Sequence, residues 1–169
     1  MICKMNAIVN TFCLDKQLFD EFQTLDINKE KIFNLIKMGA NVNAIDGGEN
    51  LLMHHLYFQD HYGINIENIK FLLDLGVDIN YKNEGFNCLF MGGLTGSVEL
   101  VEFLIKNGAD VNCVSDENES LLDWFLLDEW FQYNEKYPEP EKVTEIVKLL
   151  KKYGAKTNEE HYHPIHANC

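Results

Sequence analysis

The sequence predicts an all-α protein, a solenoid of about four stacked helix-turn-helix units joined by short hairpin loops. Two observations support this prediction. First, one five-residue phrase of the type Gly-Ala-Asn-Val-Asn occurs four times along the chain. Second, each copy follows a segment whose apolar residues recur three and four positions apart, which is the period of one helix face. Repetition on this scale is typical of solenoids, in which each unit buries its apolar face against its neighbours.

The repeated phrase begins at Gly39, Gly76, Gly108 and Gly154. Glycine suits the position directly after a helix, where the backbone turns left-handed. The four glycines lie 37, 32 and 46 residues apart, which indicates a basic period with two insertions. The apolar residues before them are Ile32, Leu35 and Ile36; Ile69, Leu72 and Leu73; Val101, Leu104 and Ile105; and Ile146, Val147 and Leu150.

Helices follow from these apolar stripes and from residues suited to capping. Asn50 and Ser120 are good N-caps, and Asn118 can replace glycine at a turn because asparagine tolerates positive φ. The predicted helices lie near residues 14–24, 29–38, 50–58, 66–74, 87–94, 98–106, 120–131 and 142–152.

The segment Gly85 to Gly93, Gly-Phe-Asn-Cys-Leu-Phe-Met-Gly-Gly, resembles the Gly-x-Thr-Pro-Leu-His-x-Ala-Ala motif of ankyrin repeats. Asn87 stands where threonine usually caps the first helix, and Gly92 and Gly93 stand where small residues let helices approach. The segment 96–101 resembles the family's Gly-His-x-Glu-Ile-Val. The repeat period also matches, since ankyrin repeats recur about every 33 residues. The motif's proline and histidine are absent from the second and fourth repeats, at 50–55 and 120–124.

The resemblance implies one ankyrin-repeat domain over residues 1–158, with repeats near 1–43, 44–80, 81–112 and 113–158, and a flexible tail at 159–169. In the last helix Lys151 replaces the apolar residue found at Ile36, Leu73 and Ile105, so we expect that face to meet water and the stack to stop there. Insertions at 58–64 and 127–141 are expected to form loops on the binding face.

Composition narrows the class of protein. The chain has 169 residues, 46% of them hydrophobic, which favours a single domain. No run approaches the roughly 18 to 20 apolar residues of a membrane span, and the first residues do not resemble a secretion signal. Five cysteines without pairing spacing indicate free thiols and a cytoplasmic location. The resemblance places Cys88 and Cys113 where ankyrin repeats usually have proline and alanine, so packing explains these two thiols without reactivity.

The charge of the chain indicates the kind of partner. The formal net charge is −13, and all 14 basic residues are lysines. Phosphate backbones require cationic grooves, and arginine is the usual bidentate donor to phosphates and guanine. Nucleic acid is therefore an unfavourable partner, and a basic protein is a complementary one.

Motifs for catalysis are absent from the sequence: there is no phosphate-binding loop, nucleophile elbow or zinc-protease motif. We therefore expect no enzyme activity, no cofactor and no small-molecule substrate. Histidines gather at His54, His55 and His61 and again in the tail from His161 to His166. Either group could bind Zn²⁺ or Ni²⁺, but neither has the paired spacing of a structural zinc site, so we predict no metal site.

The resemblance implies binding of a protein through loop tips and inner helices. On the tips it places Ile45, Asp46, Tyr81, Lys82, Asn83, Glu84, Val114, Ser115, Asp116 and Glu117, and on the inner helices Glu49, His54, Phe86, Met91, Glu119 and Trp124. Tyr81, Phe86, Met91 and Trp124 would form one aromatic band, typical of an interface. The alternative is that Phe86 and Met91 pack in the core. The second insertion adds Asp128, Glu129, Trp130, Tyr133 and Glu135; the alternative for this insertion is a longer helix whose Trp130 and Phe131 pack back on the third repeat.

These features predict a non-catalytic protein that captures, and inhibits, a basic protein. Such chains resemble bacterial immunity proteins, which neutralise toxins. An ankyrin-repeat effector of an intracellular bacterium, which binds a host protein, is the alternative, and an enzyme on an ankyrin scaffold is a third class.

Overall fold

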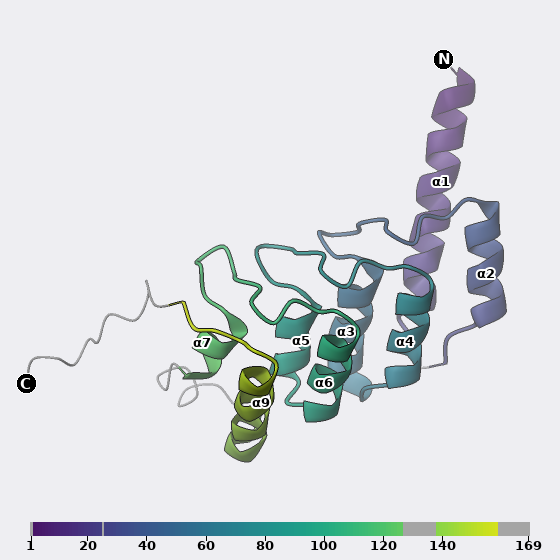
Figure 1. Cartoon of the computed structure of the whole chain (residues 1–169). Helices are drawn as coiled ribbons and strands as arrows, with labels where there is room; N and C mark the ends of the chain where they lie inside the picture. The colour runs from purple at the N-terminus through teal and green to yellow at the C-terminus, as the bar shows by residue number, and fades with distance from the viewer. Residues whose placement is uncertain (1, 25, 127–137, 159–169) are drawn as a thin grey trace, which may run out of the picture. The chain divides into compact units, whose positions relative to one another are not determined.

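The structure is a computed structural model that describes residues 2–24, 26–126 and 138–158 (Figure 1). In these ranges the regular elements are helices, and the only strand-like pairing is an isolated bridge in each of three loop tips. The predicted all-α class is therefore confirmed. The helices are α1 (Ile2–Glu21), α2 (Lys29–Met38), α3 (Leu51–Tyr62), α4 (Ile66–Asp74), α5 (Cys88–Leu94), α6 (Val98–Lys106), α7 (Leu121–Leu126) and α9 (Pro140–Lys152).

The chain divides into two compact units, unit 1 from Met1 to Tyr81 and unit 2 from Lys82 to Cys169. In unit 1, α1 packs against α2 and α3 against α4, so each predicted repeat contributes one helix pair. In unit 2, α5 pairs with α6 and α7 with α9, while contacts of α5 with α7 and of α6 with α9 stack the two pairs. The predicted single domain over 1–158 remains a prediction.

Side chains at the helix ends have the capping roles expected of them. Asn50 accepts a hydrogen bond from the Met53 amide at 2.9 Å, and Asn87 accepts one from the Leu89 amide at 3.0 Å. The Ser120 hydroxyl accepts from the Asp123 amide at 3.1 Å. Each glycine that opens the repeated phrase has a left-handed backbone, with φ of 110° at Gly39, 87° at Gly76, 99° at Gly108 and 85° at Gly154. Local sequence therefore sets where these helices begin and end.

The last asparagine of the phrase links consecutive repeats. In unit 1 the Asn43 side chain accepts from the Asp78 amide at 3.0 Å and donates to the Gly76 carbonyl at 3.2 Å. In unit 2 Asn112 accepts from the Lys156 amide at 2.8 Å and donates to the Gly154 carbonyl at 3.5 Å. Because one amide side chain satisfies a donor and an acceptor of the next phrase, the recurrence of asparagine has a structural cause.

The predicted apolar stripes form the cores of the two units. Ile32, Leu35, Ile69, Leu72, Val101, Leu104, Ile146 and Leu150 are all buried. Ile36, Leu73 and Ile105 are half-buried, whereas Lys151 at the corresponding position of α9 is exposed, as expected. Gly92 and Gly93 are buried, and a Cβ on either would lie 2.9 Å from a leucine methyl, of Leu104 and Leu121 respectively. Small residues are needed there because the helices approach closely.

One predicted helix start and one predicted loop are wrong. The first helix was expected over 14–24, but α1 begins at Ile2 and ends at Glu21, so it extends well past α2 (Figure 1). Ile2, Met5, Val9 and Phe12 recur three and four positions apart before Leu14, so the helical periodicity starts earlier than the predicted boundary.

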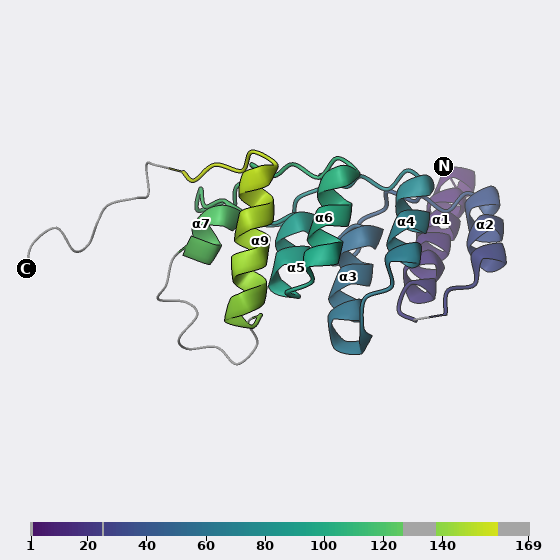
Figure 2. The same cartoon turned by 60° about the horizontal axis from the view of Figure 1, so that its bottom comes forward.

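The insertion at 58–64 was expected to be a loop, but α3 continues to Tyr62 and extends beyond α4 (Figure 2). Gln59 is fully buried, and its side-chain carbonyl accepts from the Asn65 amide at 2.9 Å. The inserted residues therefore lengthen a helix around a buried amide. For the predicted helix 120–131, the structure describes α7 at Leu121–Leu126; the rest of that prediction, the second insertion up to residue 137 and the tail 159–169 lie outside the described residues.

Candidate protein-binding surface

The first two loop tips are tight hairpin turns. The first tip is closed by the bridge between Asp46 and Glu49, and the second by the bridge between Asn83 and Phe86. Both central residues of each turn have positive φ: 58° and 89° at Gly47 and Gly48, 51° and 78° at Glu84 and Gly85. Two successive positive φ values define a type I′ turn, which matches the twist of paired strands.

Glu84 is an unusual residue for such a turn, because side chains other than glycine, asparagine and aspartate rarely adopt a left-handed backbone. Its side chain is exposed at the apex of the second tip. Strained residues of this kind gather at binding sites, where the surrounding structure holds them in place. The second tip therefore presents a carboxylate to solvent from a strained backbone position.

The third tip, between Val114 and Ser120, is wider and internally bonded. The Ser115 amide donates to the Glu119 carbonyl at 2.9 Å, and the Asn118 amide donates to the Ser115 carbonyl at 2.9 Å. Asn118 has φ 65°, as expected for a residue that replaces glycine. The segment after α9 is bonded to this tip, since the Asn158 side chain donates to the Asn118 carbonyl at 2.7 Å.

A buried carboxylate fixes the start of α7 beneath the third tip. Asp123 accepts from the Ser120 amide at 2.9 Å and from the Ser120 hydroxyl at 2.6 Å. It also accepts from the Asn158 amide at 3.0 Å. Several donors on one buried carboxylate hold α7, and thereby Trp124, in a defined orientation.

The second and third tips touch at Gly85. This residue is buried, and the Cys113 thiol lies 3.8 Å from its carbonyl oxygen. Burial raises the pKa of the Cys113 thiol, which favours its neutral form and agrees with the expected packing role. The two tips of unit 2 therefore act as one surface.

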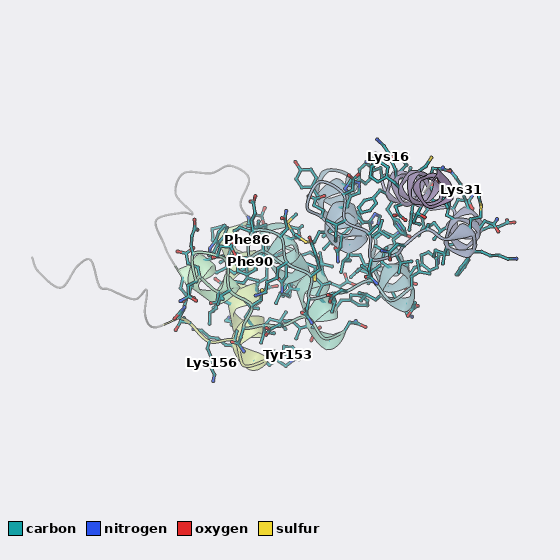
Figure 3. All side chains as sticks on the ribbon, turned by 90° about the horizontal axis from the view of Figure 1, so that it is seen from above. Lys16, Lys31, Phe86, Phe90, Tyr153 and Lys156 are labelled. Carbon is teal, nitrogen blue, oxygen red and sulfur yellow. The ribbon has the colours of Figure 1, made fainter. Side chains whose placement is uncertain are left out.

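Three aromatic rings cluster beside these tips. Phe86 closes the second tip just before α5, and Phe90 lies in the first turn of α5 (Figure 3); their ring centroids are 5.1 Å apart in an edge-to-face arrangement. Trp124 packs edge-to-face on both, with centroid distances of 5.3 Å to Phe86 and 5.9 Å to Phe90. Phe90 is buried, while Phe86 and Trp124 are half-buried. Of the residues expected on inner helices, Glu49, Phe86 and Glu119 instead lie in the tips before α3, α5 and α7. Phe86 and Trp124 pack on buried Phe90 and keep part of their surface exposed. Their role in an interface therefore stays a prediction.

A carboxylate orients the tryptophan. The Trp124 indole Nε1 donates to Glu119 Oε2 at 2.7 Å, and both side chains are half-buried. Because the hydrogen bond joins the third tip to α7, it fixes the rotamer of the ring. We name the set Phe86, Phe90, Trp124 and Glu119 the aromatic cluster.

The structure brings together part of the predicted site. Phe86, Glu119 and Trp124 form the aromatic cluster, and the exposed residues Lys82, Glu84, Asp116 and Glu117 belong to the adjoining tips with half-buried Asn83 and Val114. Met91 is half-buried on α5. Tyr81 belongs to unit 1, where its hydroxyl donates to the Gly48 carbonyl at 3.0 Å, so the continuous band with Tyr81 stays a prediction. Asp128, Glu129, Trp130, Tyr133 and Glu135 lie outside the described residues.

Sequence reasoning missed Phe90 and a group of residues on α1. Phe86 lies in the tip before α5, so no helical spacing links it to Phe90, and the contact between the two rings appears only in the structure. In unit 1, Phe12, Asp15, Lys16 and Phe19 of α1 line a hollow together with the first tip. Their spacing places them on one helix face, but Phe12 fell before the predicted start of the helix.

The two central histidines have structural partners in unit 1. His54 Nδ1 lies 3.1 Å from Glu49 Oε2, and its ring packs edge-to-face on Phe19 at 5.1 Å. His55 is fully buried, and its Nδ1 donates to the Phe22 carbonyl at 2.7 Å. Among the side chains that the structure describes, no three histidines, cysteines or carboxylates are grouped to hold a metal ion.

Acidification should weaken the fold through His55. Burial, which disfavours the charged ring, lowers the pKa of His55 below its ordinary value of 6.5, although the Phe22 carbonyl opposes this. The unfolded chain therefore binds the proton more tightly, so the stabilisation is present above the unfolded pKa and is lost as the pH falls below it. We expect the free energy of unfolding to drop between about pH 7.5 and pH 5.5 in urea titrations, and to drop less in His55→Gln. Equal drops in both proteins would contradict this origin.

No helix in the described ranges is long and apolar enough to cross a membrane.

Comparison with known proteins agrees with the repeat geometry. A family model described as ankyrin repeats (3 copies) matches residues 24–115, more than half of the chain. An ankyrin repeat protein of Acanthamoeba polyphaga mimivirus, R598, is 35% identical over 89 residues, which cover 52% of this chain and 25% of that protein. The serine/threonine-protein kinase TNNI3K of Mus musculus is 45% identical over 56 residues, 32% of this chain and 7% of the kinase.

This chain thus spans only a quarter or less of either relative's length. The family match, the paired helices and the hairpin tips all indicate the ankyrin repeat. Ankyrin repeats serve as protein-binding modules. The chain belongs to the ankyrin repeat family.

Proposed function

We propose that the protein captures a basic protein through the aromatic cluster and the two tips of unit 2. The observation that supports this most directly is the cluster itself, in which half-buried Phe86 and Trp124 are held in fixed orientations beside exposed carboxylates. Rigid aromatic side chains supply much contact area at little entropic cost, and they dominate interface energetics.

Charge supports a basic partner. Glu84, Asp116 and Glu117 are exposed at the tips. Residues 81–84 and 114–117 contain these three carboxylates and one basic side chain, Lys82. The whole chain has a net charge of −13, so its field attracts cationic proteins and repels polyanions. The insertion residues Asp128, Glu129 and Glu135 are proposed to add to this acidic rim.

The finer proposal is that binding inhibits the partner, as an immunity protein inhibits a toxin. Toxic nucleases must bind polyanions and are therefore often basic, which suits an acidic inhibitor. An effector that binds a host protein has the same physical requirements. Gene neighbourhood separates the two, because a toxin gene next to this one favours immunity and a secretion system favours an effector.

The partner would first be isolated by affinity purification from the native cell and identified by mass spectrometry. A partner of low isoelectric point would contradict the proposal.

The electrostatic part is tested with the triple variant Glu84→Gln, Asp116→Asn and Glu117→Gln. Because the tips steer the encounter, we expect association with the isolated partner to slow roughly tenfold at low salt, with a weaker salt dependence. Surface plasmon resonance at two salt concentrations measures both. The matched control changes the same number of charges on α4, α6 and α9, Glu67→Gln, Glu99→Gln and Glu145→Gln, all exposed. Equal slowing in the two triple variants would remove the tips from the site.

The short-range part is tested with Trp124→Ala. Loss of the ring should raise the dissociation rate constant roughly thirtyfold or more, which corresponds to about 2 kcal/mol of binding free energy. The association rate constant should change little. Phe33→Ala, which removes an aromatic ring that is 54% exposed on α2, is the control and should leave dissociation unchanged. Circular dichroism verifies folding. If Trp124→Ala unfolds the chain, Trp124 belongs to the core and the interface assignment fails.

A further inference from the structure

A hollow of about 70 Å³ opens in unit 1 between α1 and the first tip. Its lining residues come from two segments: Phe12, Asp15, Lys16 and Phe19 from α1, and Ala44, Ile45 and Asp46 from the first tip. None of these residues is part of the aromatic cluster. The hollow lies on the Lys16 side of α1, whereas Lys31, which pairs α2 with Glu21, lies on the other side of the helix (Figure 3).

Apolar side chains form the floor and both lips of the hollow. Phe19 is buried and supports the floor, because His54 packs against its ring. Phe12 on one lip is 70% exposed and Ile45 on the other is 47% exposed. Large apolar side chains on facing lips of a recess lose water when an apolar group enters between them. The size and lining of the recess suit one aliphatic side chain rather than a whole ligand.

Carboxylates outnumber amines around this recess. Asp15 and Asp46 line it, and Lys16 is the cation among the lining residues. Asp15 is held in place because its Oδ1 accepts from the Asn41 amide at 2.6 Å. Glu49, at the base of the same tip, is tied to His54 beneath the floor. An aliphatic side chain with a cation next to it therefore complements both the apolar recess and its acidic rim.

We propose that this hollow binds an aliphatic side chain of another protein, flanked by a lysine or arginine that pairs with Asp46 and Asp15. A second copy of this chain is a less favourable occupant, since two chains of net charge −13 repel each other. The proposed site lies in unit 1 alone, and the aromatic cluster lies in unit 2. Binding at either site can therefore be disproved without affecting the proposal for the other.

The test is a titration of the full chain, labelled with ¹⁵N, with three acetylated and amidated peptides followed by NMR. The peptides are Gly-Lys-Leu-Lys-Leu-Gly, its alanine counterpart with both leucines replaced, and its acidic counterpart with both lysines replaced by glutamate. We expect saturable shifts of the amides at Phe12, Lys16, Ile45 and Asp46 with the first peptide. The alanine and acidic counterparts should bind at least about fivefold more weakly, because each lacks one of the two interactions.

Variants of the lining give opposite expected signs. Phe12→Ala, on an exposed lip, should weaken binding of the leucine-lysine peptide, and Asp46→Asn should weaken it about two- to fivefold. Lys16→Gln should tighten binding by a similar factor, because it removes the cation that repels the peptide. Phe33→Ala on α2 is the control and should change nothing. Ile45→Ala provides a second test of the apolar lips if Phe12→Ala alters the circular dichroism spectrum.

The proposal would be overturned by shifts scattered over the chain, by equal binding of the acidic peptide, or by weaker binding in Lys16→Gln. Shifts that arise from protein concentration alone, without peptide, would assign the hollow to self-association and would also overturn it.

Discussion

Replacing Gly85 with alanine is expected to cost unit 2 about 3 to 5 kcal/mol of stability. Two separate penalties add up. Gly85 has φ 78°, a conformation that alanine adopts poorly, and its Cβ would lie 2.2 Å from the Asp116 amide nitrogen and 2.5 Å from the Ser115 carbonyl carbon. Those atoms are backbone, so the second and third tips would have to separate. Urea titration followed by circular dichroism measures the loss.

Gly154→Ala is the matched control for Gly85→Ala. Gly154 lies in the same unit with φ 85°, but a Cβ there would meet nothing within 4 Å. Only the conformational penalty remains, so the expected loss is about 1 to 2 kcal/mol. If the two alanine variants lose equal stability, the contact between the tips does not contribute and the description of one joined surface is wrong.

Leu104→Ala should cost roughly 2 to 5 kcal/mol, because it leaves a cavity in the core of unit 2. Leu104 is fully buried on α6, and its methyl group fills the space that Gly92 leaves open on α5. Removing the side chain loosens the contact between the two helices of this repeat. The midpoint and slope of a urea titration report the change.

Lys151→Ala on α9 provides the comparison for Leu104→Ala. Lys151 is exposed, so its truncation should be near neutral, within about 0.5 kcal/mol. Similar losses at the two positions would show that the face of α9 bearing Lys151 is packed rather than solvated.

Helix ends and core positions were predictable because their causes are local. Each of these features follows from residues within a few positions of each other. Examples are the asparagine caps at Asn50 and Asn87, the left-handed glycines of the repeated phrase, and the apolar stripe that contains Leu104. Two local features were predicted wrongly. The start of α1 was placed too late, although Ile2, Met5, Val9 and Phe12 recur at helical spacing, and the extension of α3 depends on Gln59, whose side chain bonds to His55 and Asn65.

The candidate site was predictable only in part. The resemblance to ankyrin repeats placed Phe86, Glu119 and Trp124 on binding positions, and the structure brings these three side chains together. The family resemblance gave no indication that Glu119 fixes the indole of Trp124 or that buried Phe90 completes the cluster. The hollow of unit 1 was missed as a site, although Ile45 and Asp46 had been placed on a tip, because its other wall is formed by α1.

The sequence by itself determined the repeat, the helix pairs and the side of each helix that is buried, because period and capping are properties of short segments. Only the tertiary structure decided which side chains from different repeats share a surface. The contact of Trp124 with Phe86, and of the third tip with Gly85, depends on how far one repeat is offset from the next. That offset results from close packing between helices and from bridging side chains such as Asn112, and no single segment encodes it.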